Sequence, residues 1–218
     1  MSAELENEWT EITNDAGINF DKKQYWWAKI LQNYSAEGRQ YHDLLSLEEK
    51  FKHFQTIKTQ LKNPVAVAFA IFFQYLEYSP RLVDYNKKNI ELFTEFFKDC
   101  ELGLESLLYS DVIVLLEAAD TSSTEEHKTD GAIGADDKHY FLDLDMVVLG
   151  SSPESYAAYA DKVKQEYHFL PPPVYNDLRV KVLQNFLQIP NIFATKEFRE
   201  KYEAQARSNI QKEVESLK

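Results

Sequence analysis

The amino-acid sequence predicts an all-α fold, a single compact bundle of several helices. Glycine and proline interrupt helices, yet they number only 6 and 7 among 218 residues, and strand-like alternation of apolar and polar side chains is scarce. Hydrophobic residues make up 44% of the chain and aromatic residues 14%, so buried apolar surface can offset the loss of chain entropy. Because no shift in composition divides the chain into comparable halves, we expect one domain: residues 1–24 form an N-terminal extension or first helix, and residues 25–218 form the helical domain.

Apolar side chains at spacings of three and four predict the helices of the first half. A capping-box pattern, Ser-Leu-Glu-Glu at 46–49, suggests where one of them begins. The segment after Pro64 has no polar face before Gln74 and Tyr75, so we expect a central, buried helix there. The expected helices cover residues 25–34, 65–78, 86–99 and 104–119, with one more that begins between residue 39 and the capping-box pattern at Ser46 and ends at Asn63-Pro64.

Composition changes abruptly after the fifth expected helix. Residues 120–139 are rich in Ser, Thr, Asp, Glu and Gly, which predicts a flexible surface loop. The apolar stretch 141–150 then carries two carboxylates, Asp143 and Asp145, on an expected helix or turn. Three further helices are expected, one from Ser152-Pro153 to the stop at Pro171-Pro172-Pro173 and the others over about 175–188 and 195–217.

Charge and motif content exclude several functions. A net charge of −12 without a basic cluster would repel a phosphate backbone, so nucleic acid is not expected as a partner. The nucleophile elbow G-x-S-x-G and the glycine-rich phosphate loops are absent from the sequence. Cys100 is the only cysteine, which suits a reducing compartment, the cytosol or the nucleus. We expect no membrane segment, because no apolar run is long enough.

Several stretches between about Tyr25 and the C-terminus follow the sequence motifs of one known family. Residues 141–150, Phe-Leu-Asp-Leu-Asp-Met-Val-Val-Leu-Gly, are similar to the family's F-L-D-A-D-L-x-x-L-G. Residues 34–44 resemble its Y-S-E-P-x-R-H-Y-H-T-L, in which Arg39 and His42 keep their places. Positions that follow the family's pattern in order include Tyr156, Tyr159, Tyr175, Arg179, Phe186-Leu187, Ile192-Phe193 and Ala206-Arg207-Ser208-Asn209-Ile210. In these stretches the chain resembles a family of predicted metal-dependent phosphohydrolases of the HD superfamily, and the resemblance implies an HD-domain-like helical bundle.

The same resemblance implies that most of the metal ligands are lost. A family metal-binding histidine corresponds to Ser46, and the His-Asp pair that names the superfamily corresponds to Gln74-Tyr75. An HD site holds a divalent metal with several His and Asp side chains and activates a bound water. Asp145, with Asp143 as a second carboxylate, is what survives here, and one or two carboxylates bind Mg²⁺ weakly. We therefore expect a vestigial site at these five positions, no catalytic residues and no cofactor; Mn²⁺, Mg²⁺ or Zn²⁺, if bound at all, would be held by Asp145 and Asp143.

The same residues can instead have purely structural roles. Asp143 can cap a helix or pair with a cation such as Arg179, and Gln74 with Tyr75 can be satisfied structural partners or line a neutral pocket for a nucleotide-like ligand. Arg39, His42 and Arg179 are the candidates for ligand contacts. An alternative metal site would combine histidines and carboxylates near the expected loop, although their spacing fits no ligand motif: His127, His139, Asp136, Asp137 and Asp143.

The sequence thus predicts a phosphohydrolase-like protein that is catalytically inactive, a pseudoenzyme that binds or scaffolds a protein partner. Two other functions remain open. A divergent hydrolase would act on a nucleotide or another phosphate ester through Asp143, Asp145 and histidines from elsewhere, and would require a divalent metal. A metal-free sensor would bind a small nucleotide in the vestigial cavity. Similarity of fold does not choose among the three.

Overall fold

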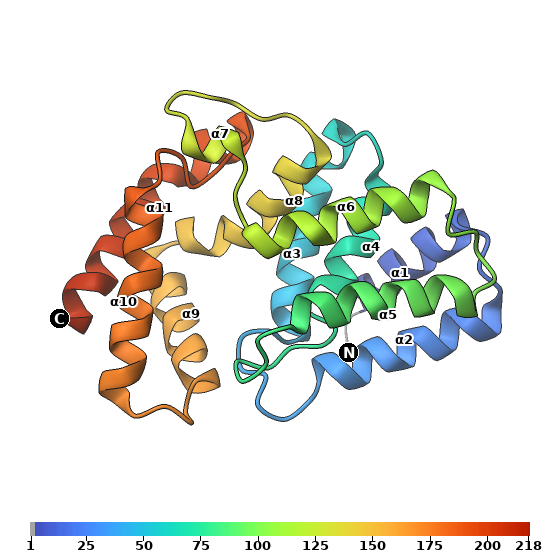
Figure 1. Ribbon diagram of the computed structural model, residues 1–218, viewed down its shortest axis with the longest axis horizontal. Coiled ribbons are helices and arrows are strands. Elements are labelled where there is room, and N and C mark those ends of the chain that lie inside the picture. Colours follow the sequence, from blue (N-terminus) through green and yellow to red (C-terminus); the bar gives the residue numbers. More distant parts are fainter. Residues whose placement is uncertain (1–2) are drawn as a thin grey trace. The chain divides into compact units, whose positions relative to one another are not determined.

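Figure 1 shows a computed structural model of the chain, which describes residues 3–218. The structure is 73% helix, and no described residue lies in a strand, which confirms the all-α fold class. The contacts divide the chain into two compact units, Met1–Thr121 and Ser122–Lys218, where the sequence predicted one domain. The boundary falls at the composition change near residue 120. Residues 1 and 2 of the predicted N-terminal extension lie outside the described residues.

Unit 1 is built around the apolar helix α4. Every residue of this helix from Ala66 to Gln74 is buried, as expected for a helix without a polar face. Asn63 caps its start, because the Asn63 side chain accepts a hydrogen bond from the Ala66 N–H at 3.1 Å. Helix α4 contacts α1, α3, α5 and α6 (Figure 1). The elements of unit 1 are α1 (Ala3–Asp15), α2 (Phe20–Tyr34), α3 (Leu44–Ile57), η1 (Lys58–Gln60), α4 (Pro64–Gln74), α5 (Tyr85–Asp99) and α6 (Leu107–Thr121).

Aromatic rings fill the interior of unit 1. The rings of Trp9 and Phe72 meet edge to face at 5.3 Å, and those of Trp26 and Phe96 meet similarly at 5.2 Å. Such pairs contribute about 0.5–1.5 kcal/mol each beyond the area that they bury. At the edge of this core, Cys100 follows the end of α5 and is only 8% exposed. Burial raises the pKa of the Cys100 thiol to about 12, which keeps it protonated at neutral pH.

The start of α3 differs from the sequence prediction. The N-cap residue is Asp43, whose side chain accepts a hydrogen bond from the Ser46 N–H at 3.0 Å, while the Asp43 N–H donates to the Ser46 hydroxyl at 3.2 Å. The capping box predicted from Ser46 was therefore wrong by three residues: Ser46 closes the box instead of opening it. Glu49, which the predicted box required, pairs with Lys52 on the helix surface.

Unit 2 packs α10 and the 3-10 helix η2 against α11. Gly150, at the end of η2, lies so close to α11 that a Cβ atom there would be 2.6 Å from Cβ and 2.8 Å from the carbonyl oxygen of Tyr202. Only glycine permits this approach. Asn209 supports it by donating to the carbonyl oxygens of Leu149 and Ser151. The elements are α7 (Glu125–Lys128), α8 (Asp137–Met146), η2 (Val147–Gly150), α9 (Pro153–Glu166), α10 (Pro172–Gln188) and α11 (Lys196–Leu217) (Figure 1).

The segment 120–139, which composition predicted to be a loop, contains the end of α6, all of α7 and the first residues of α8. His127 and His139 are buried within unit 2, at 3% and 2% exposed. Each ring sits at the third position of a capping box, where its Nδ1 accepts a backbone N–H. Composition did not reveal these helix starts because the capping interactions use polar side chains.

No helix in the described part of the chain combines the length and the apolar character that crossing a membrane requires.

Candidate functional site

Unit 1 brings Arg39 and His42 close to Gln74 and Tyr75. Arg39 Nη1 donates a hydrogen bond to the carbonyl oxygen of Tyr75 at 2.6 Å, and Nη2 donates to that of Leu76 at 2.7 Å. The ring of His42 packs against the ring of Tyr75, with centroids 4.6 Å apart. A guanidinium that satisfies backbone carbonyls fixes the turn that follows a helix. Arg39 therefore holds the chain where it leaves α4.

The positions aligned with the family's metal motifs also take part in local contacts. Gln74 is 4% exposed, and its Oε1 accepts a hydrogen bond from Lys50 Nζ at 3.3 Å. The same ammonium group lies 5.0 Å from the centre of the Tyr75 ring, within cation–π range. Ser46 is used in the cap of α3. These contacts give all three residues a structural role in unit 1.

Asp143 on α8 is fully buried in unit 2, with 0% of its surface exposed. Its Oδ1 accepts the Ala194 N–H at 2.9 Å, and its Oδ2 accepts the N–H and the hydroxyl of Thr195 at 2.8 and 2.6 Å. Thr195 is the N-cap residue of α11, and a carboxylate is favourable at the N-terminus of a helix. Asp143 thus fixes the residues that lead into α11, while the Thr195 side chain itself caps the helix by accepting the Phe198 N–H.

The environment of Asp143 perturbs two pKa values in opposite directions. Burial raises the pKa of Asp143 to about 7, although its hydrogen bonds with Thr195 and Ala194 act the other way. His127 Nε2 lies 4.0 Å from Asp143 Oδ1, beyond a direct hydrogen bond. Burial lowers the pKa of His127 to about 4, so its imidazole is neutral at neutral pH.

We expect the buried neutral His127 to contribute to the free energy of unfolding at neutral pH, and we expect this contribution to be lost in acid. Its folded pKa of about 4 lies below the ordinary 6.5, so this contribution is fully present above about pH 6.5 and disappears as the pH falls toward 4. The raised pKa of Asp143 has the opposite sign and favours the folded state as the pH falls below about 7. Urea denaturation of the wild type and His127→Gln at a series of pH values isolates the histidine. The difference between their free energies of unfolding should shrink with falling pH; a constant difference would contradict a buried neutral imidazole.

The alternative metal site around the two buried histidines is not formed. His127 Nδ1 accepts the Thr124 N–H at 2.8 Å, and His139 Nδ1 accepts the Asp136 N–H at 3.1 Å. The remaining nitrogen of His139 lies 2.9 Å from a carboxylate oxygen of Glu126. In neither unit does the described chain gather three or more His, Cys, Asp or Glu side chains in a group that could hold a metal ion. The sequence alternative that combined these histidines with nearby carboxylates was wrong because both Nδ1 atoms cap helices.

Arg179 pairs with Glu213 rather than with Asp143. Its Nε and Nη2 donate to the two carboxylate oxygens of Glu213 at 2.8 and 3.0 Å, and both side chains are about nine-tenths buried. The Tyr156 hydroxyl donates to the same carboxylate at 2.6 Å. The predicted pairing of Asp143 with Arg179 was therefore wrong. Asp145 is half-buried on α8; burial raises the pKa of the nearby Tyr159, and the charge of Asp145 acts in the same direction.

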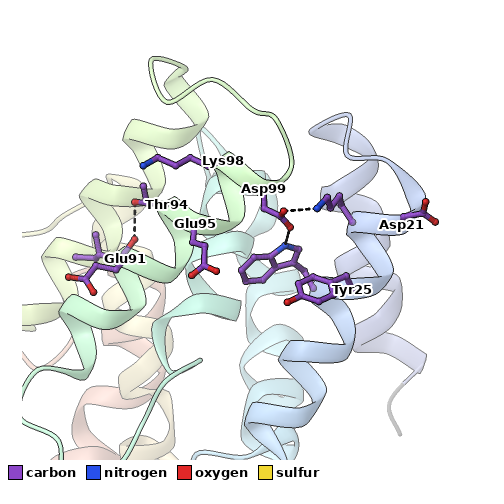
Figure 2. A pocket seen from close by; sticks show the side chains of 10 residues that line it. Asp21, Tyr25, Glu91, Thr94, Glu95, Lys98 and Asp99 are labelled. Atoms are coloured by element: carbon purple, nitrogen blue, oxygen red, sulfur yellow. Dashed lines mark hydrogen bonds and ion pairs between the residues drawn. The ribbon is translucent and has the colours of Figure 1, made fainter.

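A groove of about 1050 Å³ lies between α2 and α5 in unit 1 (Figure 2). Asp99 links the two helices at one end, where it accepts hydrogen bonds from Lys22 and from Trp26 Nε1. Figure 2 shows Glu95 extending from α5 toward α2, on which Tyr25 lies. The residues that line the groove come from both helices: Asp21, Lys22, Tyr25, Trp26, Ile90, Glu91, Thr94, Glu95, Lys98 and Asp99.

Sequence reasoning missed this groove. The sequence predicted a helix with an apolar face over residues 25–34, and Trp26 on it is indeed 1% exposed, whereas Tyr25 is 59% exposed. Glu91 and Glu95 lie in the helix predicted over residues 86–99, for which the sequence indicated no site. The signal available was the position of Tyr25 directly before the buried Trp26 and Trp27, which places its ring at the edge of the apolar face of α2.

Comparison with known proteins identifies no relative of this chain. The chain matches no model of a protein family, and neither the curated proteins nor the solved structures that were searched contain a match.

Proposed function

We propose that the protein is a non-catalytic binding module with the helical frame of an HD-type hydrolase, and that its partner is another protein. One observation carries the proposal. Both carboxylate oxygens of Asp143 accept hydrogen bonds from the chain itself, three in all, in a place with no solvent exposure. A metal ligand directs a lone pair at its ion. The geometry favours a carboxylate that stabilises the fold over one that holds a metal.

The other positions of the vestigial site support the same proposal. Ser46 caps α3, and Gln74 contacts Lys50. Arg179, a candidate ligand contact, has a carboxylate partner in Glu213. Hydrolysis of a phosphate ester on the HD plan needs several convergent ligands and an activated water. Asp145 alone supplies one carboxylate.

The α2–α5 groove is the surface that we propose for the partner. It is open to solvent, and it combines aromatic side chains with carboxylates, whereas the vestigial positions are taken up by internal contacts. The module would work in the cytosol or nucleus, without a cofactor. Aromatic side chains are enriched where proteins bind one another, because they bury large areas at little entropic cost.

The test is the metal content of protein purified without chelator, combined with thermal shifts on adding Mn²⁺, Mg²⁺, Zn²⁺ and a panel of nucleotides. We expect metal well below one equivalent and no stabilisation by metal or nucleotide. The matched variants are Asp145→Ala and Asp177→Ala, the second being an exposed aspartate on α10.

Two outcomes would overturn the proposal. Near-stoichiometric metal that is lost in Asp145→Ala but kept in Asp177→Ala would restore the hydrolase. Stabilisation by one nucleotide in the absence of metal, rising with its concentration as mass action requires, would establish the sensor instead.

A further inference from the structure

We propose that the exposed face of α10 binds the same face of a second copy of this chain, with the two helices antiparallel. The inference goes beyond the proposed function, because it concerns unit 2 rather than the α2–α5 groove. It rests on an apolar stripe along α10, on two charges beside the stripe, and on the way in which a two-fold axis brings these features together.

Three aliphatic side chains form the stripe on the exposed side of α10. Val174, Leu178 and Val182 are 49%, 43% and 41% exposed. They are four residues apart, so they line up along one side of the helix and extend over about 12 Å at 1.5 Å per residue. A single exposed aliphatic residue is ordinary on a protein surface, whereas a continuous row on a helix is typical of a face that packs against a partner.

Two side chains of opposite charge lie beside the stripe. Asp177 and Lys181 are exposed, and neither forms an ion pair or a side-chain hydrogen bond within residues 3–218. They are four residues apart, so they lie one helical turn from each other on the same flank of α10. Both charges are therefore available to a partner that presents the opposite charge at the matching place.

A two-fold axis at Leu178 makes this face complementary to itself. With the helices antiparallel, Val174 of one copy lies opposite Val182 of the other, and the two copies of Leu178 meet. Each flank of the helix then faces the same flank of the other copy, so Asp177 lies within about 3 Å, measured along the axis, of the level of Lys181. The dimer contains this pair twice. A parallel arrangement would place like charges opposite one another, so charge selects the antiparallel one.

The size and charge of the chain predict a weak dimer. One pair of helix faces buries less than the roughly 1,600 Å² of a standard protein interface, and a net charge of −12 repels two copies at low ionic strength. At about 0.15 M NaCl the Debye length is about 8 Å, so the distant charges are screened while the close pairs at α10 still act. Thermal shifts and urea titrations at low micromolar concentration report on the monomer, and Asp177→Ala changes them little.

The experiment measures self-association of the full chain by sedimentation equilibrium, from about 10 to about 500 µM, where weak interfaces are populated. We expect a monomer–dimer equilibrium. Leu178→Glu places two carboxylates at the two-fold axis and should raise the dissociation constant at least about tenfold, equivalent to about 1.4 kcal/mol.

Charge variants test the pairing across the axis. Lys181→Asp should weaken the dimer several-fold, because it sets a carboxylate opposite each copy of Asp177. Asp177→Lys/Lys181→Asp should restore the affinity of the wild type, because the exchanged charges again meet across the two-fold axis. The matched control is Lys88→Asp, which makes the same change of charge at an exposed position on α5 and should associate as the wild type does. All of the substituted positions are exposed, so circular dichroism should show every variant folded.

Engineered cysteines test the orientation. With oxidised glutathione, Leu178→Cys should form a disulfide with a second copy of itself. Val174→Cys should do so only in a mixture with Val182→Cys, because two copies of position 174 lie about 12 Å apart along the axis, too far for a disulfide. The native Cys100 is buried, so the wild type should give no cross-link.

Four outcomes would overturn the inference. They are a chain that stays monomeric over the whole concentration range, a Leu178→Glu variant that associates as tightly as the wild type, an exchange variant no tighter than Lys181→Asp, and a Val174→Cys variant that cross-links equally well without Val182→Cys. None of these outcomes touches the metal and nucleotide test, so self-association and the proposed binding function fail separately.

Discussion

Replacing Asp143 with alanine is expected to lower the free energy of unfolding by about 3–5 kcal/mol. The substitution leaves the N–H groups of Ala194 and Thr195 and the Thr195 hydroxyl without their acceptor in a fully buried place. Each unsatisfied buried donor costs about 1–3 kcal/mol, and partial relaxation recovers some of the sum. Asp143→Asn, which keeps the volume but turns one acceptor into a donor, should fall between alanine and the wild type. Urea denaturation followed by far-UV circular dichroism measures the change.

The matched control is Asp177→Ala, which removes an exposed carboxylate from the same unit. Surface substitutions of this kind stay within about 0.5 kcal/mol of the wild type. If Asp143→Ala were as stable as Asp177→Ala, the carboxylate would have no structural role. The observation that carries the proposed function would then be lost.

Removing the partner of Glu213 should have a comparable effect. Arg179→Ala leaves a carboxylate that is about nine-tenths buried with only the Tyr156 hydroxyl as donor, and breaking a buried ion pair on one side costs about 3–5 kcal/mol. The double variant Arg179→Met/Glu213→Met should recover much of the loss, because no buried charge then remains unpaired. A double-mutant cycle in urea gives the coupling energy.

An exposed ion pair in the same chain serves as the reference. Lys52 and Glu49 are bonded at 2.6 Å, but their side chains are 54% and 62% exposed, and such pairs contribute about 0–1 kcal/mol. Lys52→Ala should therefore change stability little. An Arg179→Ala variant that resembled Lys52→Ala in stability would contradict a stabilising role for the buried ion pair of Arg179 with Glu213.

Helices with a strong apolar pattern were predictable from the sequence. The segment after Pro64 formed the buried helix α4, and the expected helix at 195–217 is α11 with Thr195 as its N-cap. The three prolines at 171–173 were taken only as a stop, whereas α10 begins at Pro172. The predicted helix boundary was wrong here because proline is common both after the end of a helix and in the first turn of the next one.

The candidate sites were less predictable because they depend on contacts between distant segments. The donors to Asp143 lie 51 and 52 residues further along the chain. No sequence motif predicts that these residues form hydrogen bonds with one another. The α2–α5 groove arises from the packing of two helices whose bonded residues, Trp26 and Asp99, are 73 positions apart. The carboxylates themselves were found from the resemblance, but their partners required the fold.

The reactivity of Cys100 with thiol reagents can report on the opening of unit 1. Its thiol is buried and its pKa is about 12, so reagents that attack thiolates meet a protected and protonated group. Unit 2 contains no cysteine, since Cys100 is the only one in the chain. The rate at which a thiol reagent labels the protein therefore measures how often unit 1 opens. Labelling of the wild type and of Asp143→Ala side by side would show whether the two units unfold together or one at a time.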